Sequence, residues 1–153
     1  WKEPQLKNNH KLALILAGKG KLSKLSEIEN FNNVLVLNRF LENEEFMAII
    51  KIADYIILPY RRISQSGVLL TVLKEKKLII VSDVGGLTEP FKFGSIGYIL
   101  NSLKTKDLAN TILNASIELP KNINSKSEVW DSIFKHYDWK NIGKITENLY
   151  KEF

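Results

Sequence analysis

The chain has 153 residues, a net charge of +5 from 22 Lys and Arg against 17 Asp and Glu, and no cysteine. Its length fits a single domain, residues 1–153, that can bury roughly two-thirds of its unfolded surface. Without cysteine, disulfides and thiolate zinc sites are excluded. No apolar run approaches a membrane helix in length, and no secretion signal is visible, so we expect a cytoplasmic protein.

The positive charge comes from scattered lysines rather than from a block. A modest positive excess favours anionic partners, which include nucleotides, phosphorylated substrates, acidic lipid surfaces and nucleic acid, and a solvated lysine-rich surface is the competing interpretation. The sequence has no finger, recognition helix or interleaved aromatic and Arg pattern, so we expect no nucleic-acid partner.

The first third of the chain alternates strand and helix patterns. Strands are predicted over residues 12–17 and 34–37, and the first is followed by Gly18-Lys19-Gly20. A short amphipathic helix is expected over residues 22–29. The clearest helix covers residues 42–53, where apolar side chains recur at i, i+3, i+4 and i+7: Phe46, Ile49, Ile50 and Ala53.

The middle of the chain continues the alternation. Strands are predicted over residues 55–58, 78–81 and 97–100, with a helix over 68–73 and one helical turn over 88–91. Continuous apolar runs bounded by turn residues are typical of strands buried on both faces of a parallel sheet.

The C-terminal part is predicted to be helical. Thr105 can cap a helix that ends at residue 119, just before Pro120. Ser125 and Glu128 fit a capping box for the next helix. Asp138 can cap the last helix, which carries the apolar stripe Ile142, Ile145, Leu149 and Phe153. The whole pattern predicts an α/β fold, a Rossmann-like doubly wound parallel sheet of about five strands with extra C-terminal helices.

Two loops at the predicted carboxyl edge of the sheet suggest an anion site. Ser64-Gln65-Ser66-Gly67 precedes a helix, where capping residues leave N–H groups that attract phosphate. Gly85-Gly86 follows the next strand and lets the backbone approach a ligand where a side chain would collide. In parallel sheets, ligands lie beyond these strand ends. An ordinary helix cap and an ordinary turn are the competing interpretations.

Other polar residues near these loops have two interpretations each. Arg61 and Arg62 can pair with phosphate or belong to a solvated loop. Asp83 and Glu89 can receive a ligand hydroxyl or serve as turn and cap residues.

The sequence has no motif for a metal or for a catalytic nucleophile. His10 and His136 lie far apart and fit no metal spacing, so each is expected to be a surface or capping residue. Neither a Walker loop nor a nucleophile elbow is present. The sequence therefore predicts no metal site and assigns no catalytic residue.

Six segments occur here in the order in which a known family has them: Leu12–Gly20, Ala53–Pro59, Ser64–Leu70, Leu78–Glu89, Gly97–Leu100 with Asp107–Ala109, and Tyr137–Trp139. Together they resemble the C-terminal, donor-binding domain of retaining glycosyltransferases with the two-domain GT-B architecture, of the family 4 type. The resemblance covers almost the whole chain.

The resemblance implies a metal-independent enzyme that transfers a hexose-type sugar from a UDP- or GDP-linked donor to a glycan or lipid-linked acceptor. It implies a set of donor-binding residues: Arg39 and Phe40 at the base, Ser64, Gln65, Ser66, Gly67 and Val68 at the diphosphate, Thr71 where the family has a ribose-binding Glu, and Gly85 and Gly86 along the donor pocket. The chain departs from the family's Glu-x7-Glu pattern, since Ile63 and Thr71 occupy those positions, so the catalytic residues stay unknown.

The resemblance also implies parts that lie upstream of Trp1: the acceptor-binding N-terminal domain and the domain's first, central strand with its basic residues. That strand belongs between the strands at Leu12 and Tyr55. We therefore expect these residues alone to be inactive, with a sheet that closes over the gap or borrows a strand in an oligomer. The full enzyme is expected to act in polysaccharide biosynthesis, with peripheral association at the inner membrane surface.

The sequence leaves two alternative functions open. One is a non-catalytic nucleotide-binding or regulatory α/β module, which the missing glutamates favour. The other is an epimerase-like or phosphorylase-like GT-B enzyme, against which the ending Tyr137-Asp138-Trp139 counts.

Overall fold

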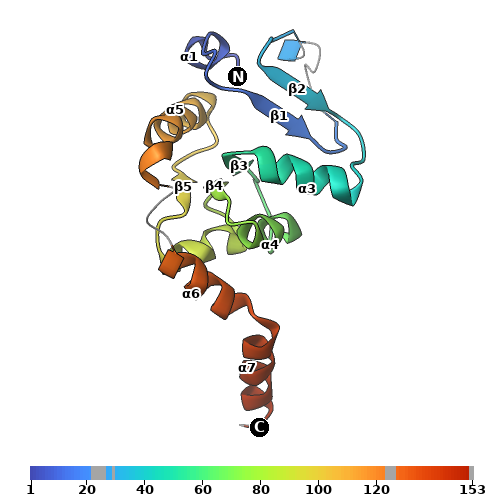
Figure 1. Ribbon diagram of the computed structural model, residues 1–153, viewed down its shortest axis with the longest axis vertical. Coiled ribbons are helices and arrows are strands. Elements are labelled where there is room, and N and C mark those ends of the chain that lie inside the picture. The colour runs from blue at the N-terminus through green and yellow to red at the C-terminus, as the bar shows by residue number, and fades with distance from the viewer. Residues whose placement is uncertain (22–26, 29, 123–126, 152–153) are drawn as a thin grey trace.

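The computed structural model describes residues 1–21, 27–28, 30–122 and 127–151 as strands alternating with helices (Figure 1). All five predicted strands are present, and all ladders are parallel. They are β1 (Leu14–Ala17), β2 (Val34–Leu37), β3 (Tyr55–Leu58), β4 (Leu78–Ser82) and β5 (Gly97–Leu100). The predicted α/β architecture is therefore confirmed.

Apart from α1, which was not predicted, the helices follow the predicted order. They are α1 (Pro4–Lys7), α3 (Asn43–Ile52), α4 (Gly67–Lys74), the 3₁₀ helix η1 (Gly85–Phe93), α5 (Thr105–Asn122), α6 (Ser127–Tyr137) and α7 (Trp139–Lys151). Most of the predicted helix over residues 22–29, the first half of the capping box at Ser125, and Phe153 lie outside the described residues. Asp138 sits at the N-cap position of α7, and its carbonyl accepts from the Ile142 N–H at 3.0 Å.

Two predicted helix boundaries were wrong. The single turn expected over residues 88–91 is a longer 3₁₀ helix, because Leu87 and Pro90, three residues apart, bury the same face. The helix expected to end at residue 119 continues through Pro120 to Asn122. Inside a helix, proline lacks the backbone donor and its ring crowds the carbonyl four residues earlier, and α5 ends two residues beyond it.

The core lies on both faces of the sheet β3-β4-β5. On one face, α3, α4, η1 and α6 contribute a cluster that includes Ile50, Val72, Leu87 and Ile133. On the other face, α5 packs Ala115 against Ile80 and Leu100. Successive residues of β4 point to opposite faces, and all five are buried. This strand matches the prediction of burial on both sides.

The five strands form two sheets rather than one continuous sheet. β1 pairs with β2, and β3-β4-β5 form the second sheet; no ladder joins β1 to β3 in the described part of the chain. The interruption falls where the family resemblance places its missing central strand. The strands have therefore not closed up over the gap, which was one of the two expected outcomes.

The β1–β2 sheet is tied to the N-terminal segment by one amide side chain. Asn33, just before β2, donates from Nδ2 to the carbonyl oxygens of Leu12 at 3.0 Å and Asn9 at 3.3 Å. Its Oδ1 accepts from the Trp1 indole N–H at 3.0 Å. These bonds hold α1 in place, where Leu6 is buried.

Candidate donor-binding site

The start of α4 has the capped geometry that the Ser/Gly loop predicts. Ser66 is buried at the N-cap, and its Oγ accepts from the Leu69 N–H at 3.2 Å. The N–H groups of Gly67 and Val68, which come first in the helix, donate to no acceptor within the described residues. Two amides at the positive end of the helix dipole are therefore available to an anion.

The glycine pair brings two loops into backbone contact. Gly85 has a φ of +54°, and a Cβ at this position would lie 2.0 Å from the Ile63 carbonyl oxygen. The Gly86 N–H donates to the Ser64 carbonyl at 2.9 Å. The backbone that Gly85 meets is the chain's own, so the close approach to a ligand stays a prediction. A role of this pair in lining a donor pocket stays a prediction.

A polar cluster joins η1 to the end of α6. The Tyr137 hydroxyl donates to Glu89 Oε2 at 3.3 Å, and His136 Nε2 lies 3.7 Å from Glu89 Oε1. The His136 ring also packs against the Phe93 ring at a centroid distance of 5.0 Å. Burial, together with the charge of Glu89 and the hydrogen bond to it, raises the pKa of Tyr137 to about 12. Tyr137 therefore stays a proton donor to Glu89 across the physiological range.

A cavity of about 620 Å³ lies beside these loops. Its polar end is formed by Gln65, Ser66, Gly86 and Glu89, together with His136 and Tyr137. The remaining walls come from α4, α6 and α7: Leu69, Leu70, Leu73, Lys74, Ile133, Phe134, Trp139, Ile142, Ile145 and Thr146. The cavity therefore joins a polar corner at the strand ends to an apolar groove between helices.

The residues predicted at the nucleotide base lie on the other sheet, after β2. The Arg39 guanidinium pairs with the Glu45 carboxylate through both nitrogens, with 2.7 Å between Nη1 and Oε2. This hydrogen bond and the Arg39 charge lower the pKa of Glu45. Phe40 is 81% exposed, and Lys19 Nζ lies 6.0 Å from its ring centroid. None of these contacts reaches the Ser66 loop.

The loops after β1 and β2 are themselves joined. The Gly20 N–H donates to Asn38 Oδ1 at 3.0 Å. This hydrogen bond therefore holds the Gly-x-Gly turn next to the loop that contains Arg39 and Phe40, at the carboxyl edge of the β1–β2 sheet.

Thr71, at the position of the family's ribose-binding Glu, uses its hydroxyl proton inside α4. Its Oγ1 donates to the Gly67 carbonyl at 3.0 Å. The oxygen can still accept a hydrogen bond from a ligand hydroxyl. Arg61, Arg62 and Asp83 are exposed, and none forms an ion pair with another described residue.

Sequence reasoning missed the cluster of Glu89, His136 and Tyr137. His136 was expected to be a surface or capping residue, and Tyr137 was named only as part of the segment Tyr137–Trp139. A histidine next to a tyrosine at a helix end carries no signal of its partner, since Glu89 lies 48 positions from Tyr137. Only the packing of α6 on η1 brings the three together.

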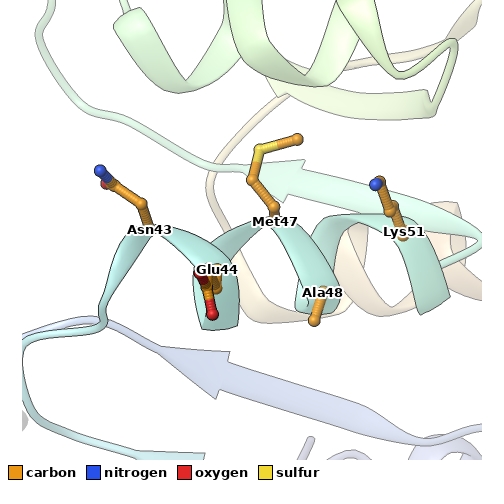
Figure 2. A pocket seen from close by; sticks show the side chains of 5 residues that line it. All are labelled: Asn43, Glu44, Met47, Ala48 and Lys51. Atoms are coloured by element: carbon orange, nitrogen blue, oxygen red, sulfur yellow. The ribbon is translucent and has the colours of Figure 1, made fainter.

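A second hollow, of about 400 Å³, lies on α3 (Figure 2). Its lining residues all belong to this one helix: Asn43, Glu44, Met47, Ala48 and Lys51. None belongs to the loops after β3 and β4, so this hollow has no connection with the candidate anion site.

Two further features bear on the kind of site. Among the residues that the structure describes, no three His, Asp or Glu side chains gather in a way that could hold a metal ion. In the same part of the chain, every helix is too short or too polar to cross a membrane.

The sequence profile of the family described as glycosyl transferases group 1 matches residues 2–116. The chain belongs to this family. The match spans β1 to α5 and so includes the Ser66 loop and the glycine pair. A search of the curated proteins found no match.

Solved structures support the same fold for this glycosyltransferase domain. Sucrose-phosphate synthase from Thermosynechococcus elongatus superposes with a TM-score of 0.62 over 91% of this chain, at 17% sequence identity. The chain spans only 37% of that protein's length. The similarity shows a Rossmann-like domain of the GT-B type.

Proposed function

We propose that this chain is the donor-binding domain of a retaining glycosyltransferase that uses a UDP- or GDP-linked hexose. The observation that carries the proposal is the start of α4. Ser66 caps it, and the N–H groups of Gly67 and Val68 are free of protein acceptors in the described structure. Membership of the glycosyltransferase family supports the proposal that the N-terminal end of α4 binds a donor diphosphate.

Such a diphosphate-binding site would stabilise its ligand electrostatically. When the sugar is transferred, negative charge develops on the departing diphosphate. Backbone donors fixed in advance stabilise that charge without reorganising, and the helix dipole adds to the effect. The contact between Gly85 and Ile63 fixes the loop in front of α4, which keeps the donors in place. On this proposal no metal ion is needed.

The base and the acceptor complete the proposal. Phe40 offers an exposed aromatic face, which suits stacking against a nucleotide base. The acceptor is a glycan or a lipid-linked glycan held by another domain, and these residues alone are inactive. The full enzyme works in the cytoplasm, at the inner membrane surface, in polysaccharide biosynthesis.

A non-catalytic nucleotide-binding module is the second candidate. Ile63 and Thr71 stand where the family has two carboxylates, and Thr71 already donates its proton to Gly67. A domain with weakened sugar contacts can still bind a nucleotide diphosphate through backbone amides.

Calorimetric titration separates these functions. We expect UDP or GDP to bind saturably, and the matching sugar nucleotide to bind more tightly if the domain also holds the sugar. Equal affinity for the nucleotide and its sugar conjugate would favour the non-catalytic module. Binding of neither nucleotide would contradict both candidates.

A further inference from the structure

Glu89 is the only carboxylate among the described residues that line the larger cavity. It lies on η1, three residues after Gly86, and side chains at this spacing in a 3₁₀ helix point to the same side. Gly86 lines the cavity as well. Asp83, the other carboxylate of this segment, is exposed and lies outside the lining. The structure therefore separates two acidic residues that the sequence left equivalent.

Two side chains at the end of α6 lie against the Glu89 carboxylate. The Tyr137 hydroxyl donates to Oε2 at 3.3 Å, and burial raises the pKa of Tyr137 to about 12, so the hydroxyl keeps its proton at neutral pH. His136 Nε2 lies 3.7 Å from Oε1, which is longer than a hydrogen bond. A carboxylate accepts about four hydrogen bonds. Most of its acceptor capacity is thus left over within the described structure.

Gly86 leaves room beside this carboxylate. A Cβ at Gly86 would lie 4.0 Å from Glu89 Oε2 and 3.9 Å from Gln65 Cγ. Because glycine lacks that carbon, ligand atoms have space between the carboxylate and the side chain of Gln65. The amide of Gln65 adds both a donor and an acceptor to this corner of the cavity.

The charges around this corner favour different parts of a ligand. The N–H groups of Gly67 and Val68, free of described acceptors, attract an anion. The Glu89 carboxylate repels an anion and accepts hydrogen bonds from hydroxyl groups. Ser66, next to the free amides, lines the same cavity as Glu89. A ligand that suits both ends has an anionic group joined to a group rich in hydroxyls, as a sugar phosphate has.

We propose that Glu89 binds hydroxyl groups of the donor sugar, and that Tyr137 is a positioning residue that holds the carboxylate for this contact. The inference rests on the proposed diphosphate site at the start of α4 and adds a contact that only the sugar makes. Hydrogen bonds to an ionised acceptor are stronger than those between neutral groups. Glu89 therefore contributes to the affinity for a sugar nucleotide and not to the affinity for the nucleotide alone.

Calorimetric titration with two matched pairs of ligands tests the inference: UDP with UDP-glucose, and GDP with GDP-mannose. In the original chain, we expect at least one sugar conjugate to bind more tightly than its nucleotide. Glu89→Gln should weaken binding of that conjugate roughly tenfold, the loss expected for a hydrogen bond to a charged group, without weakening the nucleotide. Asp83→Asn is the matched control, because it removes the same charge outside the cavity, and it should change neither affinity.

Tyr137→Phe tests the positioning role. The variant keeps the carboxylate but removes the hydroxyl that holds it, so we expect a loss of roughly threefold for the conjugate and none for the nucleotide. In the double variant with Glu89→Gln, the loss of the hydroxyl should have no further effect, since Tyr137 acts through Glu89. A full further loss in the double variant would refute the positioning role.

The affinity for the free nucleotide separates this inference from the proposed function. The role of Glu89 would be overturned by an unchanged affinity of Glu89→Gln for the conjugate, by an equal loss for conjugate and nucleotide, or by an equal loss in Asp83→Asn. A conjugate that binds the original chain no more tightly than its nucleotide would also overturn it and leave the diphosphate site standing. If the original chain binds neither UDP nor GDP, the diphosphate site itself is refuted, and the role of Glu89 with it.

Discussion

Gly85 rests directly on the carbonyl group of Ile63. A side-chain carbon on Gly85 would lie 2.0 Å from that oxygen, and the φ of +54° is itself unfavourable for other residues. The contact joins the loop after β4 to the loop that leads into α4. The contact therefore fixes the loop after β4 relative to the loop between β3 and α4.

Gly85→Ala should therefore destabilise the domain. We expect a loss of about 2–4 kcal/mol in the free energy of unfolding, because the backbone has to move and a strained φ is added. Urea denaturation followed by circular dichroism measures this. Gly67→Ala is the matched control, since its added Cβ meets nothing within 4 Å. Equal stability of the two variants would refute the contact.

Ser66→Ala removes the cap of α4. The Leu69 N–H loses its acceptor in a buried position, so we expect a loss of about 1 kcal/mol. Ser64→Ala should be close to neutral, because Ser64 is exposed and contributes its backbone carbonyl, which the substitution keeps. Thermal unfolding of both variants provides the comparison. A larger loss for Ser64→Ala would show that the cap has been assigned to the wrong serine.

The strands and most helices could be predicted because their signals are local. The apolar runs at residues 55–58 and 78–81 and the stripe on α3 depend only on neighbouring positions. The 3₁₀ helix over Gly85–Phe93 was underestimated, since its Gly and Pro residues are typical of turns. Within the candidate site, the capped start of α4 at Ser66 could be predicted, because a Ser/Gly loop before an apolar run is a local signal.

What escaped prediction depends on contacts distant in sequence. The partner of Gly85 is a loop 22 positions earlier, and the partner of Tyr137 lies on η1. Glu45, which pairs with Arg39, is only six positions away, and contact of Arg39 with a nucleotide base stays a prediction. The sequence around a polar surface residue does not show which distant residue will be its hydrogen-bond partner.

Tyr137 should titrate unusually high. Its pKa of about 12 means that the folded state keeps the proton above pH 10, where an unfolded tyrosine loses it. The resulting stabilisation is fully present below pH 10 and is lost as the pH rises towards 12. Ultraviolet titration of the five tyrosines measures the pKa, and Tyr137→Phe should delete a component near pH 12. Glu89→Gln should lower it only in part, because burial is the larger cause. An unchanged titration curve in Tyr137→Phe near pH 12 would refute the assignment.

The pair of Arg39 and Glu45 should show in the titration of the carboxylate. The pKa of Glu45 is held below its usual value, so its stabilising effect is present at neutral pH and is lost as the pH falls through the folded pKa. NMR titration of the Glu45 carboxyl in the original chain and in Arg39→Gln checks this. We expect the pKa to rise in the variant. An unchanged pKa would show that the pair does not persist in solution.

The free amide of Gly67 allows the most direct test of the donor site. Gly67→Pro removes this N–H at the first position of the helix, where proline is tolerated, and Ser66 already has the extended backbone that a following proline needs. Gly67→Ala keeps the N–H and meets no neighbour, so it controls for the added side chain.

Calorimetric titration of UDP, GDP and inorganic pyrophosphate into these two variants and the original chain decides the matter. We predict that Gly67→Pro stays folded and binds the preferred nucleotide roughly tenfold more weakly, while Gly67→Ala binds like the original, in keeping with the loss of one charge-assisted hydrogen bond. Equal affinity in all three proteins, or no binding by the original chain, would contradict the proposal that the start of α4 binds a diphosphate.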